Sequence, residues 1–114
     1  MSKRASTTDI AVFIERVKRL LSAGQYDFVP RRKNMQALAQ HGLTIADAKA
    51  EILGLVVGDY YKGPKQDLAP NRPGDIWEFK KLVDGTLFYV KVKIVQVNGE
   101  DILRCLGFHE DDYT

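Results

Sequence analysis

The sequence predicts an α+β fold in which N-terminal helices pack on a C-terminal antiparallel β-sheet, and three observations lead to it. Up to about residue 55, apolar residues recur at the three- and four-residue spacing of helices. From Asp75 to Glu110, polar and apolar residues alternate as in half-buried strands. Within that stretch, Asp84-Gly85 and Asn98-Gly99 are hairpin turn signals. Helices followed by strands are typical of the α+β class.

Length and composition indicate one domain spanning residues 1–114, with 45% hydrophobic residues to build its core. The net charge of +2 does not by itself indicate a nucleic-acid partner. The only cysteine, Cys105, excludes a disulfide framework and a cysteine-based zinc site, and we expect no cofactor. The N-terminus lacks the apolar region of a signal peptide, and no apolar run approaches the ~20 residues that span a bilayer. We therefore expect a cytoplasmic protein without a membrane partner.

The first helix is predicted to begin with Thr8 as its N-cap and to end at Gly24, after a disordered segment of residues 1–7. Its helical spacing indicates one buried face, formed by Ile10, Phe13, Ile14, Val17, Leu20 and Leu21. A short extended segment follows at residues 26–30, because Pro30 disfavours a helical conformation at the residue before it.

Two further helices are predicted. Asn34 can cap the first of them, which carries Met35, Leu38 and Ala39 and closes at Gly42. Thr44 and Asp47 have the spacing of a capping box, which predicts that the next helix begins there. Residues 58–64 are expected to form a strand or extended arm ended by Gly63-Pro64, and the proline-containing residues 65–74 a loop.

The first hairpin has a well-determined register. A two-residue turn at Asp84-Gly85 pairs Val83 with Thr86, Phe79 with Val90 and Trp77 with Val92 on the core face. The other face then carries polar residues, with Lys80 opposite Tyr89 and Glu78 opposite Lys91. Lys93 lies on this polar face as well. A slip by one residue would bury the lysines, so the register is self-consistent.

The second hairpin allows two registers. A strict two-residue loop at Asn98-Gly99 pairs Tyr89 with Phe108 and brings Phe108 to the polar face. A three-residue loop with a bulge pairs Val97 with Asp101, and then Val92 with Leu106, Val90 with Phe108 and Tyr89 with His109. We prefer the second register because it sends Leu106 and Phe108 to the core. It also places Arg104 opposite Ile94 and Cys105 on the polar face.

The polar face has the groups that metal-free RNA cleavage requires, if Lys62 from the preceding arm joins it. Glu78 could act as the base that deprotonates a 2′-hydroxyl, and His109 as the acid, since a free imidazole titrates near pH 6.5. Lys62 and Lys91 could hold the phosphate. Tyr89 could orient the phosphate or stack on a base.

Other interpretations of these residues stay open. A polar sheet face with cross-strand Glu–Lys pairs is often only solvated, and it can also bind nucleic acid without cutting it. Arg31, Arg32 and Lys33 form either a solvated turn or a phosphate clamp, and Lys80 and Lys93 are further candidate RNA-binding residues. The alternative function is thus a non-catalytic RNA- or protein-binding module.

Several segments resemble bacterial toxins of the MqsR family: FVPRRKNMQALAQHGLTIADAKAEILGL, DYYKGP, PGDIWEFKK, YVKVKI and LGFHED. The resemblance implies a RelE-like α+β fold and an mRNA interferase of a type II toxin–antitoxin system, which cuts mRNA without a metal. It also implies a cognate antitoxin as partner, and leaves open whether a ribosome takes part.

By position, the resemblance implies that the family's site lysine falls on Lys62 and its site tyrosine on Tyr89. The chain departs from a family member at two places, with Glu78 where that protein has glutamine and His109 where it has lysine. A Glu–His pair is similar to the base and acid of other RelE-like ribonucleases.

Overall fold

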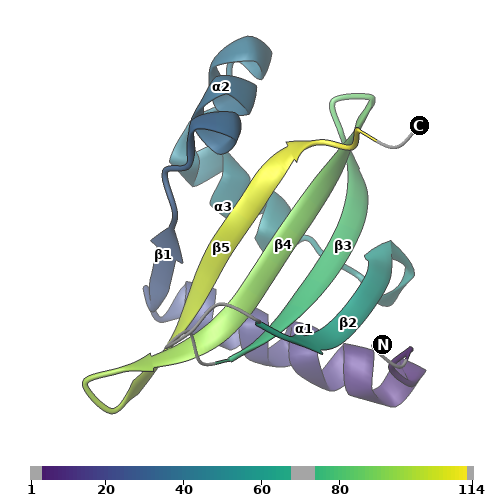
Figure 1. The fold of residues 1–114 in the computed structure, drawn as a ribbon, viewed down its shortest axis with the longest axis vertical. Helices are drawn as coiled ribbons and strands as arrows, with labels where there is room; N and C mark the ends of the chain where they lie inside the picture. The colour runs from purple at the N-terminus through teal and green to yellow at the C-terminus, as the bar shows by residue number, and fades with distance from the viewer. Residues whose placement is uncertain (1–3, 68–73, 113–114) are drawn as a thin grey trace.

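A computed structural model describes residues 4–67 and 74–112 and confirms the α+β class (Figure 1). Three helices precede most of the sheet, and a single 3₁₀ turn, η1, joins the last helix to the second strand. In chain order the elements are α1 (Thr7–Ser22), β1 (Tyr26–Phe28), α2 (Arg32–His41), α3 (Ile45–Leu53), η1 (Val57–Asp59), β2 (Tyr60–Gln66), β3 (Asp75–Val83), β4 (Thr86–Val97) and β5 (Glu100–Glu110).

The five strands form one sheet in the order β1-β5-β4-β3-β2. Adjacent strands are antiparallel, except that β1 pairs with β5 in parallel. Helices α1 and α3 lie behind the sheet, whereas α2 lies beside β5 (Figure 1). One face of the sheet therefore packs on helices, and the other is open to carry a site. Within the described ranges, no helix is long and apolar enough to cross a membrane.

Helix α1 covers the back of the sheet through the apolar face predicted from its sequence. All six predicted residues of that face are buried, and the ring of Phe13 stacks on Trp77 with centroids 4.2 Å apart. The predicted N-cap was wrong. Ser6, not Thr8, caps the helix, because its hydroxyl accepts a hydrogen bond from the amide of Asp9. Thr7 is therefore helical, and the expected disorder was wrong for residues 4–7, while residues 1–3 lie outside the described part.

Helix α2 begins earlier than predicted, at Arg32 with Arg31 as its N-cap residue, and Asn34 lies inside it. Its inward face is formed by Asn34, Ala37 and Leu38, whereas Met35 and Ala39 are exposed. The predicted end at Gly42 is confirmed, with a left-handed φ of 65°. For α3, the predicted capping box of Thr44 and Asp47 is present.

Strand β2 continues through Gly63-Pro64 to Gln66, although the sequence was expected to end it there. Two irregularities in its pairing with β3 accommodate these residues. Glycine is needed at position 63, because φ is 116° and a Cβ atom would lie 2.6 Å from the carbonyl oxygen of Ile76. The predicted loop of residues 65–74 begins later, and its residues 68–73 lie outside the described part.

The register predicted for the β3–β4 hairpin is confirmed at every predicted pair. Asp84 and Gly85 both have positive φ, as a tight two-residue turn requires. Trp77, Phe79, Val83, Val90 and Val92 are buried in the core cluster. The alternate residues Glu78, Lys80, Tyr89 and Lys91 therefore point to the opposite face.

The preferred register of the β4–β5 hairpin was wrong at the turn and right at the far end. Val97 pairs with Glu100, so the turn is the strict two-residue loop. A bulge at Leu106 then shifts the pairing, so that Val92 lies opposite Cys105, and Val90 and Tyr89 lie opposite Phe108 and His109. Cys105 consequently belongs to the core and not to the polar face, and burial raises its pKa to about 12.

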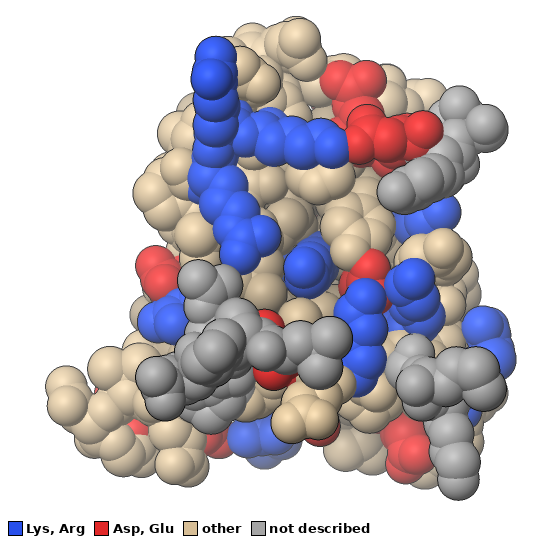
Figure 2. Space-filling view, viewed as in Figure 1, with Lys and Arg blue, Asp and Glu red and all other residues tan. Residues whose placement is uncertain are grey.

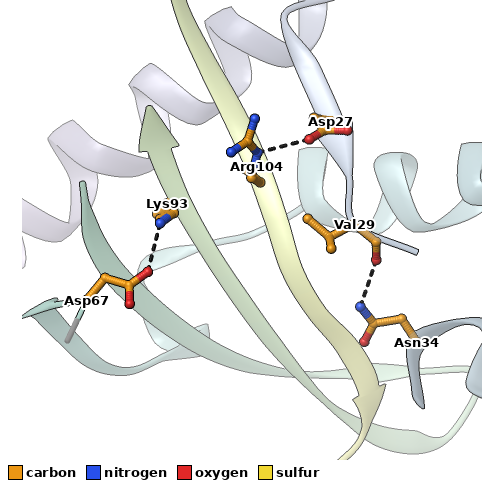
Figure 3. Close-up of polar contacts among 6 residues, drawn as sticks. All are labelled: Asp27, Val29, Asn34, Asp67, Lys93 and Arg104. Carbon is orange, nitrogen blue, oxygen red and sulfur yellow. Dashed lines mark hydrogen bonds and ion pairs between the residues drawn. The ribbon is translucent and has the colours of Figure 1, made fainter. Parts of the chain in front are cut away.

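The same shift corrects the pairing of Arg104, which lies opposite Lys93 and not Ile94. Arg104 contacts Asp27 of β1 on this face, with its Nε atom 2.9 Å from a carboxylate oxygen (Figure 3). Lys93 thus replaces the predicted apolar partner of Arg104 on β4, and the guanidinium forms an ion pair with β1.

Candidate active site

A cavity of about 300 Å³ opens on the polar face of the sheet. Lys and Arg side chains gather over α2 and across the centre of this face, with acidic side chains beside several of them (Figure 2). The cavity draws its lining from α2, from the four strands β2 to β5 and from the residues after β5: Lys33, Tyr61, Lys62, Glu78, Lys80, Tyr89, His109, Asp111 and Asp112. Four of the five predicted catalytic residues, Lys62, Glu78, Tyr89 and His109, therefore meet in one place.

Glu78 forms the floor of this cavity, and only 3% of its surface is exposed. The Tyr89 hydroxyl donates a hydrogen bond to Oε1, and Nζ of Lys65 lies 2.7 Å from Oε2. Burial raises the pKa of this carboxyl, but the hydrogen bonds from Lys65 and Tyr89 and the charges of Lys65 and Lys62 outweigh it. The net result is a pKa below the ordinary value for glutamate, so Glu78 is ionised at neutral pH.

His109 lies beside Tyr89 across the β4–β5 pair, with ring centroids 5.3 Å apart. Its Nδ1 atom is 2.9 Å from the backbone carbonyl oxygen of Glu110. A carbonyl can only accept, so Nδ1 carries the proton and Nε2 can accept or donate a second one. This tautomer is the one that an acid–base catalyst acting through Nε2 requires.

Gly107 lies beneath these rings, opposite Lys91. A Cβ atom at this position would lie 3.2 Å from Cβ of Lys91, 3.6 Å from Cε2 of Tyr89 and 3.7 Å from Nε2 of His109. The missing side chain therefore allows three side chains of the polar face to approach each other closely.

The cations of the cavity are held by aromatic and acidic neighbours. Nζ of Lys80 lies 4.0 Å from the ring centroid of Tyr61 and 3.0 Å from a carboxylate oxygen of Asp111. Nζ of Lys62 lies 5.1 Å from the same ring on its neighbour in the chain. Lys33 forms an ion pair with Asp112. Lys80 and Lys33, predicted as RNA-binding residues, thus line the same cavity as the predicted catalytic residues.

The remaining predicted residues lie elsewhere. Lys91 is on the polar face but does not line the cavity. Its pKa is lowered by burial and by the charges of Arg31 and Lys65, which outweigh the opposite effect of the Glu78 and Asp67 carboxylates. Arg31 and Arg32 are exposed at the start of α2, outside the cavity lining. Lys93 is 3% exposed and lies 2.8 Å from a carboxylate oxygen of Asp67 (Figure 3), so it is a buried structural ion pair and not an accessible phosphate ligand.

The sequence did not predict four residues of the site: Tyr61, Asp111 and Asp112, which line the cavity, and Lys65, which pairs with Glu78. Lys65 was assigned to a loop, because Gly63-Pro64 usually ends a strand. Only when β2 is known to continue to Gln66 does it become apparent that Lys65 pairs along β3, the strand that carries Glu78. Tyr61 could have been found from the DYYKGP segment, since it is next to Lys62.

Asn34 links the site to α2 and had no predicted role beyond capping. Its buried amide donates to the carbonyl oxygens of Val29 and Leu106 and accepts from the amide of Phe108, at 3.1, 3.0 and 3.0 Å (Figure 3 shows the bond to Val29). The bonds to Leu106 and Phe108 satisfy backbone groups at the edge of β5, beyond the end of β1. They hold the strand around the bulge at Leu106, next to His109.

The arrangement combines an ionised carboxylate bonded to a phenol, an imidazole whose Nε2 has no hydrogen-bond partner among the described residues, and ammonium groups. Such a set can move protons and stabilise an anion at neighbouring points. Among the residues described, no group of three or more His, Cys, Asp or Glu side chains could hold a metal ion.

A scan against protein-family models and a search of curated proteins find no match to this chain.

Proposed function

We propose that the chain is an mRNA endoribonuclease that cuts by acid–base catalysis, and that it is the toxin of a type II toxin–antitoxin system. The observation that carries the proposal is the convergence of Glu78, Tyr89 and His109 with Lys62 and Lys80 around one open cavity. The resemblance of DYYKGP, GDIWEFKK and the following YVK strand to MqsR-family toxins supports the same function.

In the proposed reaction, the 2′-oxygen of the substrate attacks the neighbouring phosphorus while its proton is removed. The bond from phosphorus to the 5′-oxygen breaks, and protonated His109 supplies a proton from Nε2 to the departing oxygen. The products are a 2′,3′-cyclic phosphate and a 5′-hydroxyl. Lys62 and Lys80 stabilise the negative charge that accumulates on the phosphate oxygens.

Glu78 accepts the proton in this proposal, and because the carboxylate is buried, the proton reaches it through Tyr89. Its Oε1 already accepts the hydrogen bond of Tyr89, whose ring lines the cavity. The phenol oxygen can take the 2′-proton while its own proton passes to Glu78. The reaction therefore needs an ionised Glu78, which its lowered pKa ensures at neutral pH.

The proposed partners follow from this activity. The substrate is single-stranded mRNA, cut in the cytoplasm without a metal, and a cognate antitoxin silences the enzyme. Expression of this protein alone in a bacterium should arrest growth, and co-expression of the antitoxin from the neighbouring gene should restore growth.

A non-catalytic binding module is the second candidate, and one observation favours it. Glu78 is nearly fully buried and is paired on both oxygens, as a purely structural ion pair would be. In that case, the cavity would hold a phosphate without cutting RNA, and Glu78 would only position Lys65 and Tyr89.

Cleavage of a defined mRNA in the presence of EDTA separates the two candidates. We expect the wild type to cut, and Glu78→Gln and His109→Ala each to lose roughly 10²–10⁴-fold in rate. Glu100→Gln, at the exposed turn of the β4–β5 hairpin, is the matched control and should cut normally. Full activity in both site variants contradicts the assignment, and RNA binding without any cleavage by the wild type favours the binding module.

A further inference from the structure

A second hollow, of about 180 Å³, is also lined by His109. It shares Lys33, His109 and Asp112 with the candidate active site. Its remaining lining comes from α2 and the end of β5: Gln36, Ala37, Gln40 and Glu110. A molecule bound at His109 can therefore reach from one hollow into the other.

Gln36 and Gln40 are four residues apart on α2, so their side chains lie on one side of the helix. Both are exposed, and neither amide forms a hydrogen bond to another residue in the described part of the chain. An amide offers both a donor and an acceptor, which suits the polar edge of a nucleobase. Ala37 between them is small, which leaves space over the helix.

We propose that this hollow binds a nucleobase adjacent to the scissile phosphate and that Gln36 and Gln40 read its edge. The inference rests on the proposed function. Proteins recognise single-stranded RNA by splaying bases out, stacking them on side chains and bonding their edges. His109 borders both hollows, so one nucleotide can place its phosphate in the active site and its base against the two amides.

The position of α2 relative to His109 is fixed at both ends of the helix. Near its start, Asn34 bonds to the backbone of Leu106 and Phe108. At its end, Nε2 of His41 lies 2.8 Å from a carboxylate oxygen of Glu110, and its ring packs edge-on against Phe88. A recognition site needs such rigid support, because loosely held groups discriminate poorly.

The test first maps the positions at which the wild type cuts a defined RNA. The bases on each side of the cut are then permuted, and kcat/KM is measured for wild type, Gln36→Ala, Gln40→Ala and the control Gln96→Ala. In parallel, fluorescence anisotropy measures binding of the same oligonucleotides with 2′-O-methyl groups, which cannot be cut. Gln96 is an exposed glutamine on β4 near the distant Asn98-Gly99 turn.

We expect the wild type to prefer one base at one flanking position by about tenfold, and both site variants to lose most of this preference. Gln96→Ala should keep it. Cleavage with an unchanged base profile in both variants overturns the inference and leaves the nuclease intact. Base-selective binding that the variants lose, without cleavage by any protein, supports the inference while contradicting the nuclease. A wild type that neither cuts nor binds RNA overturns both.

Discussion

Nζ of Lys65, on β2, lies 2.7 Å from Oε2 of the buried Glu78 on β3. This pair joins the edge strand to the floor of the cavity. Lys65→Ala should lower the free energy of unfolding by about 1–2 kcal/mol, because it leaves a buried carboxylate with fewer partners, although Lys65 itself is partly solvated. Urea denaturation at pH 7 measures the change. Lys33→Ala breaks the pair with Asp112, in which both side chains are more than half exposed, and should change stability little, so equal losses in both would contradict the difference in burial.

The stability contributed by Glu78 should depend on pH in one direction. Its pKa in the folded state is lowered, so the unfolded chain takes up this proton first as the pH falls. The contribution is complete above the unfolded pKa of roughly 4.3 and is lost as the pH drops toward the folded pKa. Urea denaturation of wild type and Glu78→Gln between neutral and acidic pH should therefore show a difference that shrinks below about pH 4.5. A difference independent of pH would contradict the lowered pKa.

Gly107→Ala should impair the site more than the fold. The added Cβ would crowd Lys91, Tyr89 and His109, and small displacements of reacting groups are costly in rate. We expect at least about a tenfold loss in kcat, with a change in unfolding free energy near 1 kcal/mol. Gly58→Ala is the matched control, because nothing lies within 4 Å of its Cβ position. Equal rates for both variants would show that the space over Gly107 has no role.

Asn34→Ala should lower both stability and activity. It removes the partner of three backbone groups and should cost about 2–4 kcal/mol of unfolding free energy. It should also lower kcat, because these bonds hold β5 next to His109. Met35→Ala, at the exposed neighbouring position, should leave both quantities nearly unchanged. Thermal unfolding and RNA cleavage provide the two measurements.

Cys105 tests the observed register directly. It is buried in the core, and its pKa is raised to about 12, so the thiol stays protonated and inaccessible at pH 8. Iodoacetamide should label it slowly in the native protein and rapidly in urea. Rapid labelling of the native protein would place Cys105 on the polar face, as the predicted register did.

Local signals predicted much of this fold correctly. The turn at Asp84-Gly85 determines its own register, since both residues can adopt positive φ and the strands on each side alternate cleanly. For the same reason, Glu78, Lys80, Tyr89 and Lys91 were placed on the correct face. The capping box of Thr44 and Asp47 is likewise encoded within four residues.

The errors arose where distant parts of the chain decide the structure. The bulge at Leu106 depends on Asn34, which lies far away in the sequence and bonds on both sides of it. Lys93 alternates like a surface residue, but Asp67 from a different segment makes its burial possible. Lys65 could be placed only once β2 was known to pass Gly63-Pro64.

The bulge at Leu106 also determines the parity of the chain at its C-terminal end. If Leu106 paired with Lys91 instead of bulging, every residue after it would change sides of the sheet, turning His109 toward the helices and Phe108 toward the solvent. An extra residue in the Asn98-Gly99 turn would restore the original sides. The length of a remote turn and an irregularity beside the cavity are therefore interchangeable, and homologous chains could differ at both places while keeping the same imidazole over the same phenol.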